Sequence, residues 1–287
     1  MPGGKYHFEI AIILRNAYLI SSILSNSEVW YGLTQSNYEQ LEQTDEMWMR
    51  DLFSCSSSVS KDLLYLELGL VQIRHIIEMR RLLYLHHILK QRKDSLLHRF
   101  FMAQLTNPTK GDWVSQVLSN LSEFPINLEL RDIQNMSAKK YKLIVKNHIK
   151  EKAFRYLTAR KEGRQSEHSK GTLLEYSELK MSEYLSGIDT DISIEERKWL
   201  FKCRVEDIDI KGNRRWKYPD ISCSSCNKNI PETQSHILIC GPLLGQNEQL
   251  SYIPDYSELY QGTLDEQVYI SRILWDNFKR IVRNDIV

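Results

Sequence analysis

The chain has 287 residues, of which 42% are hydrophobic and 26% are charged, and these proportions exclude a disordered or collagen-like polypeptide. A chain of this length can bury a sizeable core in one large domain or two small ones. The formal net charge is only +1, so a nucleic-acid partner has to be argued from local charge and not from the total.

The segment that comes nearest to a membrane span runs from Phe8 to Leu24. A membrane-spanning helix needs about 18 uninterrupted apolar residues, and Glu9, Arg15 and Asn16 interrupt this one. The segment also lacks the small-residue cleavage site that is typical of a secretory signal. We therefore expect a core helix here, no membrane partner, and an intracellular protein of the nucleus and cytoplasm.

The spacing of apolar residues predicts that the first two thirds of the chain are mainly helical. In chain order, the expected helices cover residues 8–25, 35–53, 61–68, 71–93, 95–105, 113–121, 137–162, 173–185, 194–204 and 264–283. Thr34 and Ser60 can cap two of them, and Gly69 is expected to end the short helix after Ser60. Ser193 with Glu196 fits a capping box. Strand signals are few, so the predicted fold class is mainly α.

The most regular expected helix runs from Ser137 to Glu162. Its apolar residues recur every four positions: Tyr141, Val145, Ile149, Ala153 and Leu157. The segment 137–164 holds ten Lys or Arg residues against two Glu residues. A basic face beside the apolar stripe consists of Lys139, Lys142, Lys146 and Lys150. Such a face suits contact with a phosphate backbone. The alternative is an ordinary solvated lysine face, which most surface helices have.

Three of the five cysteines lie between positions 223 and 240, and with one histidine they form the pattern Cys-x2-Cys-x9-His-x3-Cys. These four residues are Cys223, Cys226, His236 and Cys240. A Cys-x-x-Cys turn puts two thiolates on one side of a knuckle, and residues four apart share one face of a helix that Thr233 can cap. Four ligands close a tetrahedral site without an open position, so we predict a structural zinc ion. The alternative is four unrelated residues, with the cysteines buried as small apolar groups.

A second basic patch, mixed with aromatic residues, leads directly into the first predicted zinc ligand. Its residues are Lys202, Arg204, Lys211, Arg214, Arg215, Trp216, Lys217 and Tyr218. Cationic side chains can neutralise phosphates while aromatic rings stack on unpaired bases. Acidic residues at 206, 207 and 209 dilute the charge of the patch. Because the patch adjoins the knuckle, we expect it to contact nucleic acid.

The sequence contains no recognisable catalytic constellation. It has no Asp-Asp pair of the kind used by two-metal polymerases, no Gly-x-x-x-x-Gly-Lys loop and no Gly-x-Ser-x-Gly turn. We therefore expect that this chain alone is not an enzyme, that it has no catalytic residues, and that it takes no small-molecule substrate.

Several stretches together resemble the C-terminal part of the reverse transcriptases of LINE-type, non-LTR retrotransposons. Residues 22–30 are similar to the segment after the polymerase palm, where Glu28 and Trp30 match the family pattern. Asn26 and Ser27 depart from that pattern. Residues 41–50 continue the segment, and residues 140–157 and 201–213 look like the basic connector of the family. The Cys/His pattern looks like the terminal knuckle of the family.

The resemblance implies a thumb-like helical unit in residues 1–107, a helical basic connector in residues 108–210, and a CCHC zinc knuckle with a C-terminal helix in residues 211–287. It also implies that this region binds RNA or DNA, holding template RNA or target DNA while carboxylates elsewhere perform the chemistry. The fingers and palm would precede Met1, so we expect a C-terminal fragment or a truncated reading frame. Two alternatives stay open: an element-derived host protein that uses the knuckle for protein contacts, and a helical scaffold that zinc staples.

Overall fold

The computed structural model of the protein describes residues 7–162, 176–186, 192–213, 217–226, 229–240, 243 and 255–284. Within these ranges the structure is helical, and its β pairing is limited to two isolated antiparallel bridges, Leu68 with Met181 and Ser222 with Pro231. The prediction of a mainly α fold is therefore confirmed. None of the described helices is both long enough and apolar enough to cross a membrane.

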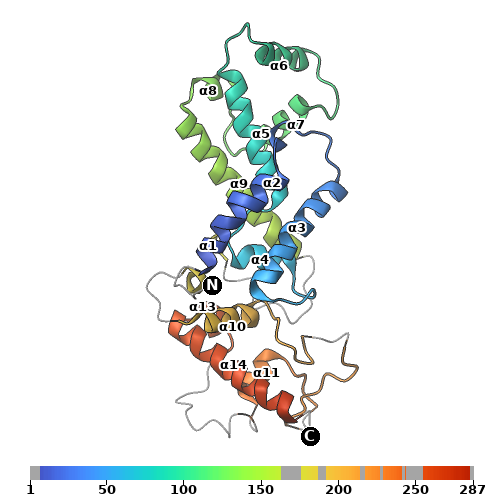
Figure 1. Ribbon diagram of the computed structural model, residues 1–287, viewed down its shortest axis with the longest axis vertical. Helices are drawn as coiled ribbons and strands as arrows, with labels where there is room; N and C mark the ends of the chain where they lie inside the picture. Colours follow the sequence, from blue (N-terminus) through green and yellow to red (C-terminus); the bar gives the residue numbers. More distant parts are fainter. Residues whose placement is uncertain are drawn as a thin grey trace. The chain divides into compact units, whose positions relative to one another are not determined.

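Most of the expected helices are present, and two further ones lie at Leu130–Asn135 and Glu258–Gln261 (Figure 1). They are α1 (His7–Leu14), the π-helical η1 (Arg15–Ile20), α2 (Ser21–Ile23), the 3-10 turn η2 (Ser27–Val29), α3 (Gln35–Phe53), α4 (Lys61–Glu67), α5 (Ile73–Leu89), α6 (Leu96–Thr106), α7 (Trp113–Ser122), α8 (Leu130–Asn135), α9 (Ala138–Glu162), the 3-10 turn η3 (Glu183–Leu185), α10 (Ile194–Arg204), α11 (Gln234–Ile239), α13 (Glu258–Gln261) and α14 (Leu264–Asn284).

The expected helix ends are mostly confirmed. The hydroxyl of Thr34 accepts a hydrogen bond from the backbone N–H of Asn37 at 3.3 Å, and Ser193 forms a full capping box with Glu196. Ser60 directly precedes α4, but its side chain makes no capping hydrogen bond. Gly69 follows α4 with a φ of +60°, and a Cβ there would meet a backbone nitrogen at 2.1 Å, so only glycine fits.

The prediction of a helix over residues 173–185 is wrong for the part that the structure describes. Within the described residues 176–186 the chain forms only the 3-10 turn η3 and the bridge from Met181 to Leu68. The backbone N–H of Ser182 donates to the carbonyl of Glu67 at 2.9 Å. The backbone here therefore forms a hydrogen bond with a distant segment and not the hydrogen bond within its own segment that a helix would require.

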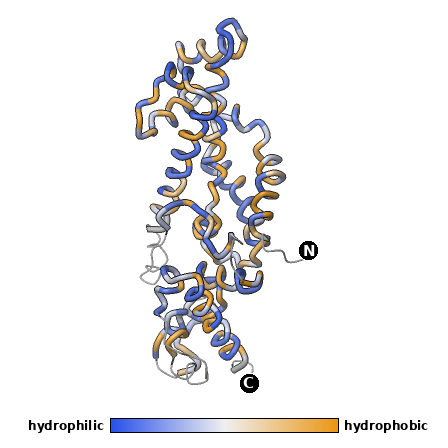
Figure 2. Tube along the Cα trace, turned by 90° about the vertical axis from the view of Figure 1, so that its left-hand side faces the viewer, coloured by the Kyte–Doolittle hydropathy of each residue, from blue (hydrophilic) through white to orange (hydrophobic). Residues whose placement is uncertain are grey.

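One compact unit, here called the helical unit, consists of Ile12–Met47 and Leu70–Arg160. Its main core joins α5 to α6, α7, α8 and α9. The predicted apolar stripe of α9 is confirmed, because all five of its residues are at most 1% exposed. The hydroxyl of Tyr141, the first of them, donates to the carbonyl of Leu82 on α5 at 3.1 Å. Figure 2 shows hydrophilic and hydrophobic stretches alternating along these helices, as expected when each helix buries one face.

The second compact unit, here called the knuckle unit, consists of Met1–Ala11, Trp48–Gly69 and Lys161–Val287. Three aromatic rings from distant segments stack within it: Phe8 on Phe53 at 4.8 Å, and Phe53 on Phe201 at 3.8 Å. Helix α14 packs against α10, α11 and α13. The unit also buries Glu67 completely, and its carboxylate pairs with Arg204 at 2.7 Å.

These two units divide the chain differently from the three parts expected at 1–107, 108–210 and 211–287. The core on α5 takes residues from both sides of position 107, such as Leu85 and Val114. The segment 48–69 belongs with the C-terminal residues, because Glu67 binds Arg204 and the backbone at Ser182. Side-chain pairing between distant segments, and not sequence order, sets the division.

Candidate metal centre

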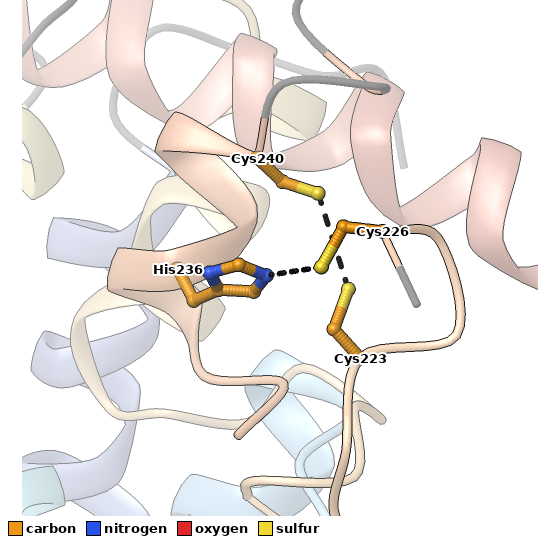
Figure 3. Close-up of side chains that lie close together, drawn as sticks. All are labelled: Cys223, Cys226, His236 and Cys240. Carbon is orange, nitrogen blue, oxygen red and sulfur yellow. Dashed lines mark hydrogen bonds between the residues drawn. The ribbon is translucent and has the colours of Figure 1, made fainter. Parts of the chain in front are cut away.

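The four residues of the Cys/His pattern converge in the knuckle unit, with their side chains pointing toward a common centre (Figure 3). Their sulfur and nitrogen atoms all lie within 4.8 Å of one another. The Sγ atoms of Cys223 and Cys240 are 3.9 Å apart, and Sγ of Cys226 is 3.4 Å from Nε2 of His236. The four side chains are therefore close enough to bind one metal ion, and three sulfurs with one imidazole are a donor set consistent with zinc.

A short backbone pairing presents the first two cysteines. The backbone N–H of Cys223 donates to the carbonyl of Ile230 at 2.8 Å, and the N–H of Glu232 donates to the carbonyl of Ile221 at 2.7 Å. These bonds bring the two ends of the segment 221–232 side by side. The turn at residues 224–226 then directs Cys226 back toward Cys223 (Figure 3).

Helix α11 presents the other two ligands. Thr233 caps it as predicted, because its side-chain oxygen accepts from the backbone N–H of His236 at 3.2 Å. His236 lies in the first turn of the helix, whereas Cys240 is the residue that follows the last turn. The backbone at Cys240 is extended, with φ −66° and ψ 114°. The expectation that both residues lie within the helix therefore holds for His236 alone.

A buried carboxylate holds the cysteine turn to the chain that precedes it. Glu232 is only 1% exposed and accepts from the backbone N–H groups of Lys211, at 3.1 Å, and Ser224, at 3.3 Å. The N–H of Gly212 donates to the Glu232 carbonyl at 2.9 Å, and a Cβ at Gly212 would lie 2.5 Å from that oxygen. Residues 211–212 thus pass so close to the ligand segment that glycine is required.

Helix α14 supports the centre from the far end of the chain. Asn277 is fully buried and donates from its side-chain amide to the carbonyl of Ile237 in α11 at 3.1 Å. Arg280 donates to the carbonyl of Leu243 at 3.0 Å, just after the last ligand. The first contact holds the helix that carries His236, and the second holds the chain three residues after Cys240.

The surroundings of Cys240 disfavour its thiolate form when no metal is bound. Burial, followed by the neighbouring thiols of Cys223 and Cys226, raises the pKa of the Cys240 thiol to about 12. The side chain of Cys240 is only 2% exposed, so little water reaches a charge on its sulfur. A bound cation reverses this balance, because it replaces the thiol protons and neutralises the clustered thiolates.

The predicted basic face of α9 is partly exposed to solvent. Lys139, Lys142 and Lys146 are exposed, while Lys150 is half-buried. The buried stripe of the same helix lies in the core of the helical unit, so the three exposed lysines stand on a fixed support.

The described residues of the second basic patch are not all exposed. The prediction that Arg204 contacts nucleic acid is corrected. Arg204 is 5% exposed, pairs with Glu67, and donates to the carbonyl of Leu259 at 2.9 Å. A guanidinium engaged in this way stabilises the fold and does not reach a phosphate. Lys202 on α10 is half-buried.

Three further residues of that patch are described: Lys211, Lys217 and Tyr218. Lys217 is exposed, forms an ion pair with Asp209 at 3.1 Å, and lies 5.0 Å from the ring centroid of Tyr218. The ammonium of Lys211 donates to the carbonyl of Ser222 at 3.1 Å. Arg214, Arg215 and Trp216 lie outside the described residues.

The supporting residues Glu232, Asn277 and Arg280 were not predicted. Asn277 lies 40 positions from its partner Ile237, and Arg280 lies 37 positions from Leu243, so no local pattern in the sequence connects them. A signal for Glu232 was available, since it lies inside the ligand segment and directly before the capping Thr233.

Comparison of the chain with known protein families, with curated proteins and with solved structures found no match.

Proposed function

We propose that this protein binds nucleic acid through the basic face of α9 and that a structural zinc ion at the Cys/His centre stabilises its knuckle unit. The observation that carries the proposal is the row of exposed cations at Lys139, Lys142 and Lys146, on a helix whose other side is held in a core. A helix rises about 1.5 Å per residue, so this row extends over roughly 10 Å. Phosphates along one strand are spaced about 3.4 Å apart on the axis, so the row can meet several of them.

Zinc is the metal that the donor set favours. Thiolate and imidazole ligands at tetrahedral spacing select zinc over magnesium or calcium, which prefer oxygen. Four protein ligands leave no position for water or substrate, so the ion has a structural role and supplies no catalysis. Its place between the cysteine turn and α11 suggests that it holds these two pieces of the knuckle unit together.

We further propose that the chain is the C-terminal region of a LINE-type reverse transcriptase, which holds template RNA or target DNA. The support is the order of features along the sequence: helices, then a basic helix, then a Cys-x2-Cys-x9-His-x3-Cys segment. On this proposal the chain alone extends no primer, because the paired carboxylates that position two catalytic metals would belong to another part of the polymerase.

The test replaces Lys139, Lys142 and Lys146 by Ala in the full chain. Binding to fluorescein-labelled single-stranded RNA and duplex DNA, each in two unrelated sequences, should weaken alike for both sequences. The slope of log affinity against log salt should flatten by about one unit for each phosphate that the variant no longer neutralises. The matched control replaces Lys90, Lys93 and Lys110, which are also exposed in the helical unit. Equal effects of the two triple variants, or no binding by the unaltered protein, would overturn the proposal.

A further inference from the structure

An open hollow in the helical unit lies between η2 and the first two turns of α3. Its volume is about 670 Å³, within the range of roughly 300–1,000 Å³ that is usual for sites that bind small organic groups. Its apolar lining comes from Val29, Trp30, Tyr31, Leu33 and Leu41. Neither the metal centre nor the basic face of α9 contributes to it.

The inner wall of the hollow is firmly supported. Trp30, Leu33 and Leu41 are half-buried and pack against the core cluster that contains Ile73 and Ile77 of α5. These side chains are therefore fixed by contacts behind them and keep their shape without a ligand. The outer wall differs, because Val29 and Tyr31 remain 46% and 64% exposed. A ring that enters the hollow can stack on Tyr31 and bury both side chains.

Two carboxamides, those of Asn37 and Gln40, lie in the lining of the hollow. The Oδ1 atom of Asn37 accepts from the backbone N–H of Thr34 at 2.9 Å and from its hydroxyl at 2.8 Å. Because a backbone N–H can only donate, this contact fixes which way the Asn37 amide points and leaves its NH2 group to donate elsewhere. Gln40, one turn later, is exposed and offers both a donor and an acceptor.

The charge of the lining narrows the class of ligand. All of the residues that line the hollow are uncharged, so it is unsuited to a phosphate or a carboxylate, which need cations. An aliphatic chain would leave the two amides unused. A planar neutral group that carries hydrogen-bond donors and acceptors on its edge uses both the aromatic and the amide parts.

We propose that this hollow binds one unpaired nucleobase, which stacks against Tyr31 and forms hydrogen bonds with Asn37 and Gln40. The inference rests on the proposed function, because a base reaches the hollow as part of a bound strand. It adds a ligand class and a second place of contact. The lysines of α9 would hold the phosphates of a strand, while this hollow takes a base that has left its stack.

The test uses neutral nucleosides, which carry no phosphate, and the full chain. Adenosine, cytidine, guanosine and uridine are titrated while the side-chain amide signals of Asn37 and Gln40 and the indole signal of Trp30 are followed by NMR. At least one nucleoside should shift these signals together. Tyr31→Ala and Gln40→Ala should each raise its Kd about 5-fold or more. Tyr18→Ala, which removes an aromatic ring that is 72% exposed elsewhere in the helical unit, should leave the Kd unchanged.

Two results would overturn this inference: no shift with any nucleoside, or a stronger shift with N-acetyl-tryptophanamide, which would identify a site for a protein side chain. The outcome is independent of the lysine experiment. Nucleoside binding without polynucleotide binding would refute the proposed function alone, and polynucleotide binding without nucleoside binding would refute the base site alone. The Tyr31→Ala substitution should reduce the affinity for single-stranded RNA. It should not change the slope of log affinity against log salt, because it removes no charge.

Discussion

Both units contain a well-buried ion pair, Arg15 with Asp45 in the helical unit and Arg204 with Glu67 in the knuckle unit. The helical unit adds a large apolar core on α5, whereas the knuckle unit adds four described side chains that lie close enough to bind one metal ion. Apolar packing depends on buried area and tolerates moderate changes of shape. Ionised and metal-binding groups depend on a few specific partners, and removing one partner leaves another buried without compensation. The two units should therefore respond very differently to chelators.

Loss of the metal should have the largest effect. Cys240→Ser should remove about one equivalent of zinc per chain, as measured by elemental analysis of protein purified without added metal. Structural zinc binding contributes about 10 kcal/mol or more to small metal-stabilised folds. Hydrogen exchange should therefore increase strongly in residues 217–243 and remain unchanged in α5 and α9. Cys55→Ser, at a cysteine outside the cluster, should keep the metal; equal zinc content in Cys240→Ser and the unaltered protein would disprove the site.

The buried ion pair should have the next largest effect. Glu67→Ala should destabilise the knuckle unit by about 3–5 kcal/mol, because it leaves the Arg204 guanidinium buried without its partner. Hydrogen exchange in the segment 48–69 measures this loss. Glu67→Gln keeps the shape but removes the charge and replaces one accepting oxygen with an NH2 donor, so it separates packing from the combined loss of charge and of hydrogen bonds. A neutral effect of both variants would show that the pair does not hold the unit together.

Acid should act on the same pair. Burial favours the neutral form of Glu67, but the charge of Arg204 and hydrogen bonds from Ser182 and Tyr176 outweigh burial and hold the pKa of the carboxyl below its usual range. A carboxyl with a lowered pKa stabilises the fold above its unfolded pKa of about 4.3, and this stabilisation is lost as the pH falls through the folded value. Stability should therefore decline more steeply below about pH 4.3 in the unaltered protein than in Glu67→Gln.

The smallest of these effects should come from the cap of α11. Thr233→Ala should cost about 1 kcal/mol, because the backbone N–H of His236 loses its acceptor. Since the helix carries a ligand, the loss should appear as a roughly 5-fold weaker affinity for zinc, measured by competition with a chromophoric chelator. Thr233→Ser keeps the oxygen and should restore the affinity. A loss of affinity that serine does not restore would mean that the threonine methyl group, and not the cap, is important.

Local patterns in the sequence predicted much of the fold and of the centre. The buried stripe of α9, the capping box at Ser193 and the cap at Thr233 each depend on residues a few positions apart, and each is confirmed. The four residues of the centre also belong to one short segment. Their convergence is confirmed, while the identity of the metal stays a prediction.

Partners far apart in the sequence were beyond such patterns. Arg204 was assigned to a basic patch together with Lys202 and Lys211, yet it pairs with a carboxylate 137 positions earlier. Arg15 looked like an interruption of an apolar run, and in the structure it is buried and pairs with Asp45. In both cases the sequence shows the charge, but only the fold shows the partner.

The long separation between Glu67 and Arg204 has a consequence for synthesis on the ribosome. Translation proceeds at roughly 5–20 residues per second. Glu67 is therefore synthesised about 7–30 s before Arg204, which follows 137 positions later. Phe53 is likewise synthesised long before Phe201, the ring on which it stacks. During that interval the residues 70–160 of the helical unit have already been made, and most of their core partners lie among themselves. The nascent chain thus exposes apolar and acidic side chains of the segment 48–69 for many seconds, a period in which a chaperone has time to bind it.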